Sequence, residues 1–266
     1  MKISKGSHKK TKVIMPVHYA GNSCELDPIL NFAKDNDIYV VEDAAQGVGA
    51  TYKSKLLGTL GDLSAFSFHE TKNITCGEGG ALVVNNSKFT DRAEIIWEKG
   101  TNRKQFFRGQ VDKYSWIDIG SSFLPSDITA AILWAQLQKI KEVTQNRLAI
   151  WDKYYEGFAN LESKGILKRP VLNPNGQHNG HIFYLTFEDL ETRNGILSHL
   201  RERKVEATFH YIPLHSSIAG RKFGRPAGEL KNTDRISDTL MRLPIYFGFD
   251  HVDYVVDMIE NYFESN

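Results

Sequence analysis

The chain has 266 residues, with 33 Lys and Arg against 32 Asp and Glu, a formal charge of +1 and 41% hydrophobic residues. This composition is typical of a folded globular protein and excludes disordered, collagen-like and coiled-coil classes. A near-neutral charge also argues against nucleic-acid binding, which needs an excess of basic residues to meet the phosphates.

The first half of the chain alternates short β-branched runs with helical stretches, which predicts βαβ units and a largely parallel sheet. Asp27 followed by Pro28 predicts a helix start, with the aspartate as N-cap. A second helix is expected from Ser87 to about Lys99. We expect strands at residues 12–17, 38–42, 63–68 and 81–84.

The second half predicts a smaller α+β unit behind a long helix. Residues 100–125 lack a period and are expected to form a long loop. Ser126 then begins a helix whose apolar spacing continues to Leu161. After a linker at 170–180, we expect a strand at 182–187, a helix from Thr192, a strand at 205–209 and two terminal helices. Residues 1–135 are therefore expected to form a large domain, and residues 136–266 a bridging helix and a small domain.

The number of cysteines and the length of the apolar runs indicate the cellular compartment of the protein. Cys24 and Cys76 are too few for a disulfide framework or a four-cysteine zinc site, so we expect a cytoplasmic protein. The apolar run at 13–17 contains a proline and is too short for a signal peptide. The run at 130–135 is far below the roughly 18 residues of a membrane span, so no membrane insertion is expected.

Two residues directly after predicted strands could carry chemistry. Asp43 follows the strand 39–42, at the carboxyl edge where open α/β sheets bind ligands. Lys72 follows the strand 65–68 and precedes a glycine-rich stretch at 77–80. A lysine buried there would have a lowered pKa and could form Schiff bases, although most lysines are solvated surface residues.

Several motifs in this order resemble the DegT/DnrJ/StrS-type sugar-nucleotide aminotransferases, which are pyridoxal phosphate (PLP) enzymes of fold type I. The match runs from about Lys12 to the C-terminus. The motifs that carry it are Val41-Glu-Asp-Ala-Ala-Gln46, Phe66-Ser-Phe-His-Glu-Thr-Lys72-Asn and Gly77-Glu-Gly-Gly80. Further stretches resemble the subgroup that aminates carbon 4 of dTDP-linked 4-keto-6-deoxyhexoses, namely Pro16–Gly21, Lys99–Arg103, Phe106–Tyr114 and Phe209–His215.

The resemblance implies a role for each matching residue. Lys72 would hold PLP through a Schiff base and then act as general base and acid. Asp43 would keep the pyridine nitrogen protonated, so that the ring remains an electron sink. Gln46 would lie against the ring and Ser67 would bind the phosphate. Ser122 stands where many relatives carry an asparagine that reaches the phosphate of the partner subunit's cofactor.

The substrate residues are less specific. The resemblance suggests that His210 and Tyr211 line the substrate cleft. His210 and His215 are five residues apart across a proline and lack an evident third ligand, so we expect no metal. Arg103 and Arg108, in the 100–125 loop, are candidates for a nucleotide diphosphate, because arginine pairs bidentately with phosphate. A solvated basic loop is an equally good interpretation.

The resemblance further implies a homodimer, a dTDP-sugar substrate and glutamate as amino donor. Family members carry a segment ahead of the strand that here begins at Lys12, and that segment supplies a phosphate-binding loop at a helix N-terminus. Residues Met1 to about His8 match nothing in the family and are expected to be a short tail. We therefore expect a truncated large domain. An inactive remnant, or one half of a split enzyme, is the alternative to an aminotransferase.

Overall fold

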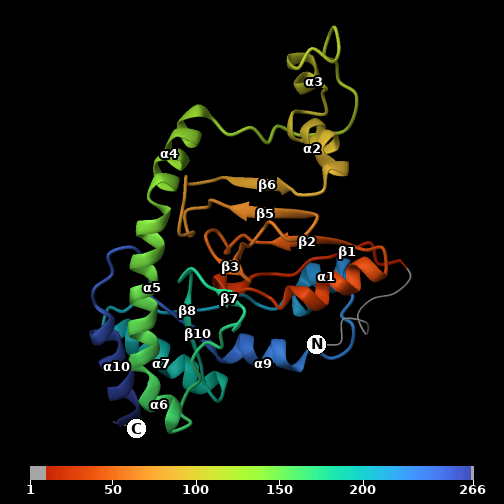
Figure 1. Cartoon of the computed structure of the whole chain (residues 1–266). Coiled ribbons are helices and arrows are strands. Elements are labelled where there is room, and N and C mark those ends of the chain that lie inside the picture. Colours follow the sequence, from red (N-terminus) through yellow and green to blue (C-terminus); the bar gives the residue numbers. More distant parts are fainter. Residues whose placement is uncertain (1–9, 265–266) are drawn as a thin grey trace.

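The computed structural model describes residues 10–264 (Figure 1), so the tail expected at Met1 to His8 lies outside the described residues. Its central element is a four-stranded sheet in the order β1-β2-β5-β6. The first two pairings are parallel and the last is antiparallel, which confirms the predicted mostly parallel sheet. The strands are β1 (Val13–Ile14), β2 (Tyr39–Asp43), β5 (Leu63–Ser67) and β6 (Gly80–Val84).

Helix α1 (Leu26–Asp35) packs on this sheet through Leu26, Ile29 and Ala33, which are buried with Val40 of β2. Its start differs from the prediction. Glu25 takes the N-cap position without a side-chain hydrogen bond, and Asp27 lies inside the first turn. The Asp27 carboxylate forms an ion pair with the Lys53 ammonium, so it does not cap the helix.

A second, smaller sheet joins distant parts of the chain. Strand β3 (Thr51–Tyr52) pairs antiparallel with β4 (Lys55–Leu56) on one side and with β7 (Gly176–Gln177) on the other. β7 lies within the stretch predicted to be a linker. The linker is thus fixed to the first half of the molecule by backbone hydrogen bonds.

Beyond β6, the chain forms η3 (Ser87–Phe89), α2 (Thr90–Trp97) and α3 (Arg103–Phe107), which project past the edge of the sheet (Figure 1). The helix predicted to be capped by Ser87 begins with a 3-10 turn, and its N-cap is Asn86, whose side chain accepts a hydrogen bond from the Lys88 amide. The predicted 100–125 loop contains α3.

The long helix predicted from Ser126 is present as three segments, α4 (Asp127–Gln138), α5 (Ile140–Gly157) and α6 (Ala159–Ser163). The Ser126 hydroxyl accepts a hydrogen bond from the Thr129 amide at 3.1 Å and caps α4 as predicted. The helix bends at Lys139 and Phe158, whose backbone leaves the helical conformation. α4 and α5 run from beside β6 to the C-terminal half (Figure 1).

The C-terminal half has an antiparallel sheet in the order β8-β10-β9. Its strands are β8 (Phe183–Thr186), β9 (Thr208–Phe209) and β10 (Leu240–Leu243), and its helical elements are α7 (Leu190–Glu202), η4 (Leu214–Ser216), α8 (Ile218–Phe223), α9 (Lys231–Thr239) and α10 (Val252–Glu264). β10 is a central strand inside a stretch predicted to be helical.

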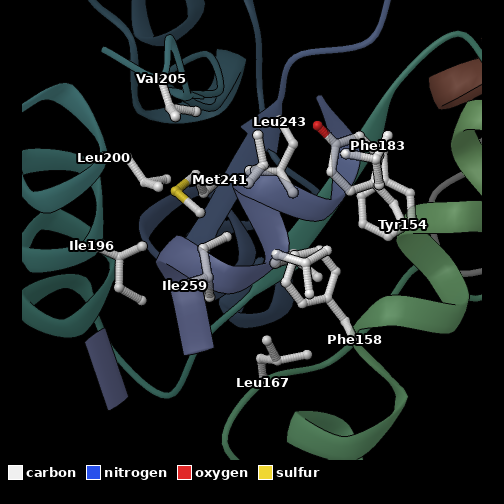
Figure 2. Close-up of a cluster of buried hydrophobic side chains, with 14 of the residues drawn as sticks. Tyr154, Phe158, Leu167, Phe183, Ile196, Leu200, Val205, Met241, Leu243 and Ile259 are labelled. Atoms are coloured by element: carbon white, nitrogen blue, oxygen red, sulfur yellow. The ribbon is translucent and has the colours of Figure 1, made fainter. Parts of the chain in front are cut away.

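This half has its own core, centred on Tyr154, Phe158, Phe183 and Met241 (Figure 2). Each of these side chains is fully buried. Their aromatic rings stack, with centroids 5.0 Å apart for Tyr154 and Phe183. Over residues 10–264, no helix is long and apolar enough to cross a bilayer.

Candidate active site

The site forms at the carboxyl edge of two neighbouring parallel strands. Asp43 ends β2 and Ser67 ends β5, and Asp43 lies opposite Ala65 in the register of this pair. The Asp43 carboxylate accepts a hydrogen bond from the Ala45 amide at 3.1 Å. Parallel strands bring their carboxyl ends to one edge, so the topology gathers polar residues from separate stretches of the chain.

Lys72 follows β5 in a short turn, in which its amide donates to the His69 carbonyl at 2.9 Å. The side chain is half-buried, and this burial lowers the pKa of the Lys72 amine. The Asp43 carboxylate opposes this effect and the Arg242 guanidinium adds to it. Asp43 and Lys72 therefore face one site, and Lys72 gives up its proton more readily than a surface lysine.

A small cavity lies beside Lys72, and two further predicted residues line it. Gln46 projects from the loop after β2, and its side-chain oxygen accepts from the Ala20 amide. Ser67 accepts from the His69 amide at 3.3 Å. Three of the residues predicted to hold the cofactor, Gln46, Ser67 and Lys72, thus line one cavity, and the charge of a fourth, Asp43, acts on the Lys72 amine.

The opposite wall comes from the segment before β8, which the sequence analysis did not select. Asn179 is buried and donates to the Gln46 carbonyl at 2.8 Å and the Val48 carbonyl at 2.9 Å. Asn73 donates to the Asn179 carbonyl at 3.0 Å, and its side-chain oxygen faces His181 Nδ1 at 2.8 Å. Because that oxygen is an acceptor, the His181 hydrogen is assigned to Nδ1.

Buried basic groups surround this wall. Burial, and then the positive charges of Arg147, Lys72 and Arg242, lower the pKa of His181 to about 3. Its imidazole is therefore neutral near pH 7. Arg147 is buried and donates to the carbonyls of Gly180 at 3.1 Å and His181 at 2.8 Å. Burial lowers the pKa of Arg147 to about 10, which leaves the guanidinium charged.

His210 and Tyr211 follow β9, on the C-terminal side of the site. Burial and the charge of Arg242 lower the pKa of His210 to about 4. The His210 ring packs edge-on against Tyr19, with centroids 4.9 Å apart. Tyr211 is 76% exposed and open to a ligand or partner. Farther along, His215 pairs with Asp234 at 2.9 Å.

Arg103, Arg108 and Ser122 lie apart from this group, in the segment beyond β6 (Figure 1). Arg103 donates to Glu98 at 2.7 Å, and Arg108 forms a two-pronged pair with Glu94 at 2.6 and 2.8 Å. Ser122 is exposed and bridges Glu98 through its backbone. The structure does not bring these three residues to Lys72 within one chain.

The chain belongs to the DegT/DnrJ/EryC1/StrS aminotransferase family, whose model matches residues 2–260. It is 37% identical to protein MJ1066 of Methanocaldococcus jannaschii, over 90% of this chain and 63% of the relative. It is 28% identical to the spore coat polysaccharide biosynthesis protein SpsC of Bacillus subtilis, over 95% and 67%. The solved structure of DesV from S. venezuelae superposes with a TM-score of 0.86 at 27% identity, over 98% and 67%.

These comparisons confirm the predicted fold class, that of the fold type I aminotransferases. The chain spans less than two thirds of the length of MJ1066. A homologous structure is known in a PLP form, so PLP is the cofactor that the family indicates. The residues fit it, because the Lys72 amine of lowered pKa and the Ser67 hydroxyl line one small cavity, and the Asp43 carboxylate acts electrostatically on that amine.

Proposed function

We propose that this protein is a PLP-dependent aminotransferase that moves an amino group from glutamate to a nucleotide-linked 4-keto-6-deoxyhexose, a dTDP-sugar. The observation that carries the proposal is the half-buried Lys72 amine facing the Asp43 carboxylate. The spore coat polysaccharide role of SpsC agrees with a sugar substrate. The subgroup motifs around Phe209–His215 favour amination at carbon 4.

Lys72 is the catalytic residue in this proposal. When bound, PLP supplies an aldehyde that takes up an amino group and a ring that withdraws electrons. The Lys72 amine would remove the proton from the substrate carbon that bears the nitrogen and deliver it to the cofactor carbon that takes up the nitrogen. Its lowered pKa suits this role, because a larger fraction of the amine is neutral at working pH.

The remaining residues orient the cofactor and substrates. Asp43 pairs with the ring nitrogen, Gln46 lies against the ring and Ser67 holds the phosphate. His210 and Tyr211 line the sugar cleft from the C-terminal half. Residues 1–135 act as the PLP-binding domain and 136–266 as the small domain, a division supported by separate apolar clusters around Val40 and Phe183.

We propose a cytoplasmic homodimer as the working form. Ser122, Arg103 and Arg108 lie beyond the free edge of β6, and in a dimer they would reach the partner subunit's cofactor phosphate and nucleotide diphosphate. Apolar side chains nearby are largely exposed, among them Ile119 (80% exposed), Ile128 (76%) and Trp134 (67%). An exposed apolar surface of this kind supports an interface with a second subunit.

The test is a titration of the purified chain with PLP, followed by visible absorbance. We expect the band of a lysine-bound cofactor in the wild type, its loss in Lys72→Ala, and its retention in Lys141→Ala, where an exposed lysine is removed. Asp43→Asn should keep the band and lower turnover by about 100-fold or more, the usual scale for removing one electrostatic partner of a developing charge, because the ring nitrogen loses its carboxylate. Wild-type turnover in Asp43→Asn would refute the assigned role.

The second hypothesis is a catalytically inactive remnant or one half of a split aminotransferase. The same exposed apolar surface favours it, because a second polypeptide that completes the fold would also cover Ile128 and Trp134. This hypothesis predicts no band with PLP alone. A band that appears only after a separate polypeptide with the family's phosphate loop is added would support the split enzyme.

A further inference from the structure

Three buried polar atoms without hydrogen-bond partners gather around Arg242, whose charge acts on Lys72. Within residues 10–264, five buried side-chain nitrogen and oxygen atoms lack a partner, and three of them are Tyr19 Oη, His210 Nδ1 and Arg242 Nε. Tyr19 lies in η2 (Tyr19–Gly21), His210 follows β9 and Arg242 lies in β10. Buried polar groups are normally satisfied, so a cluster of exceptions indicates a missing ligand.

These three side chains are close to one another. The Tyr19 and His210 rings meet edge-on with centroids 4.9 Å apart. The charge of Arg242 acts on the phenol of Tyr19, the imidazole of His210 and the amine of Lys72. The guanidinium is therefore within electrostatic reach of both the Tyr19–His210 pair and the reactive lysine.

The charge of Arg242 is uncompensated. Across the described part of the chain, its guanidinium has no carboxylate partner within ion-pair distance. Burying a guanidinium without an anion partner is costly. Since Tyr19 and Arg242 are hydrogen-bond donors, the group that satisfies them is an acceptor with negative charge.

We propose that Arg242, with Tyr19 and His210, binds the carboxylate of the amino-acid donor. This inference rests on the proposed function. An α-amino acid carries its carboxylate on the same carbon as the amine, so an anion site beside the Lys72 amine holds the donor as its nitrogen is transferred. The sugar ring of the acceptor carries neutral hydroxyl groups and no carboxylate. The guanidinium fork gives the donor one orientation.

The cofactor phosphate is the other oxyanion that could occupy this site. The two sources are separated by titrating the full-length protein in phosphate-free buffer, once with 2-oxoglutarate by calorimetry and once with PLP by absorbance. 2-Oxoglutarate is the keto acid formed from glutamate and carries the same carboxylates. Removing the Arg242 guanidinium weakens the first titration if the site holds the donor carboxylate, and the second if it holds the cofactor phosphate.

We expect Arg242→Gln to weaken 2-oxoglutarate binding at least tenfold and Arg242→Lys to weaken it less, because lysine keeps the charge and loses the fork. Tyr19→Phe should weaken it several-fold. Arg201→Gln, which removes an exposed arginine of α7, should bind like the wild type. PLP affinity should stay within about threefold in every variant. Far-UV circular dichroism checks the fold, and Arg242→Lys decides the outcome if Arg242→Gln does not fold.

Wild-type affinity for 2-oxoglutarate in both Arg242 variants would overturn the inference, as would a wild type that does not bind it. So would a loss of PLP affinity with intact 2-oxoglutarate binding, which assigns the guanidinium to the phosphate. The proposed function fails separately, when PLP gives no Lys72-dependent band. In that case an Arg242-dependent carboxylate site would still stand.

Discussion

Acid is expected to destabilise the fold through His181, whose imidazole is only 7% exposed beside a group of cations. The Asn73 side-chain oxygen accepts from Nδ1 at 2.8 Å, so the neutral ring is satisfied. A protonated ring would add a charge near Arg147, Lys72 and Arg242. Burial and these charges hold the pKa of His181 at about 3, compared with 6.5 for a free histidine.

The sign and size of the effect follow from these two values. The unfolded chain takes up this proton near pH 6.5, and the folded chain only near pH 3. The stability contributed by the neutral ring is therefore complete above pH 6.5 and is lost as the pH falls to about 3. At about 1.4 kcal/mol per pKa unit, the loss is about 2 kcal/mol by pH 5 and about 5 kcal/mol in full.

The assay is urea unfolding at about pH 7.5 and about pH 5 for the wild type, His181→Gln and His251→Gln. Between these pH values the wild type should lose about 2 kcal/mol more free energy of unfolding than His181→Gln. His251→Gln removes an exposed histidine and should follow the wild type. His178 and His210, whose pKa values are also lowered to about 4, are present in all three proteins and cancel. Equal losses in wild type and His181→Gln would refute the reasoning.

Two further substitutions test the residues that support the site, and their effect is the change in free energy of unfolding measured in urea. Glu42 is fully buried and accepts from three backbone amides and His18, so Glu42→Gln should cost about 3 kcal/mol; a cost below about 0.5 kcal/mol would contradict this account. Gly21 has a φ of +75°, and a Cβ there would lie 1.8 Å from Asn179 Oδ1, whereas Gly77 has a φ of +85° and open space. Gly21→Ala should therefore cost at least about 2 kcal/mol more than Gly77→Ala, which carries the backbone strain alone.

The local parts of the fold could be predicted from the sequence. β2 and β5 are short apolar runs with clear ends, and the residues that follow them, Asp43 and Lys72, lie at one sheet edge because the strands are parallel. The Ser126 cap is equally local, since it depends on one hydroxyl and an amide three residues away.

β10 could not be predicted, because its neighbours along the chain favour a helix and its partners lie far away. Leu240–Leu243 follows α9 directly and is rich in leucine, a strong helix former. It becomes a strand because β8 and β9 flank it on both sides. Arg242 was missed for the same reason, since a helical assignment gave no indication that it would face Lys72.

Asn179 was missed because its role depends on contacts distant in sequence. It lies in a stretch of glycine, asparagine and histidine that predicts only a linker. Its importance comes from two carbonyls of the loop after β2, at Gln46 and Val48. Asn73, which bonds to Asn179 and His181, directly follows Lys72 in the family motif. This position was the sequence signal that pointed to the hydrogen-bond network around Asn179.

The pairing of β3 with β7 joins the two halves of the polypeptide by backbone hydrogen bonds, in addition to the chain connection between them. Asn173 and Asn179, on either side of β7, bond to Asn22 and to the Gln46 loop. A recombinant fragment that stopped at residue 135 would lack the groups that hold Gln46 in place. Any PLP-dependent activity should therefore be sought by reassembling both pieces, and protease nicking within residues 170–180 should abolish that activity without removing a side chain of the proposed cofactor site.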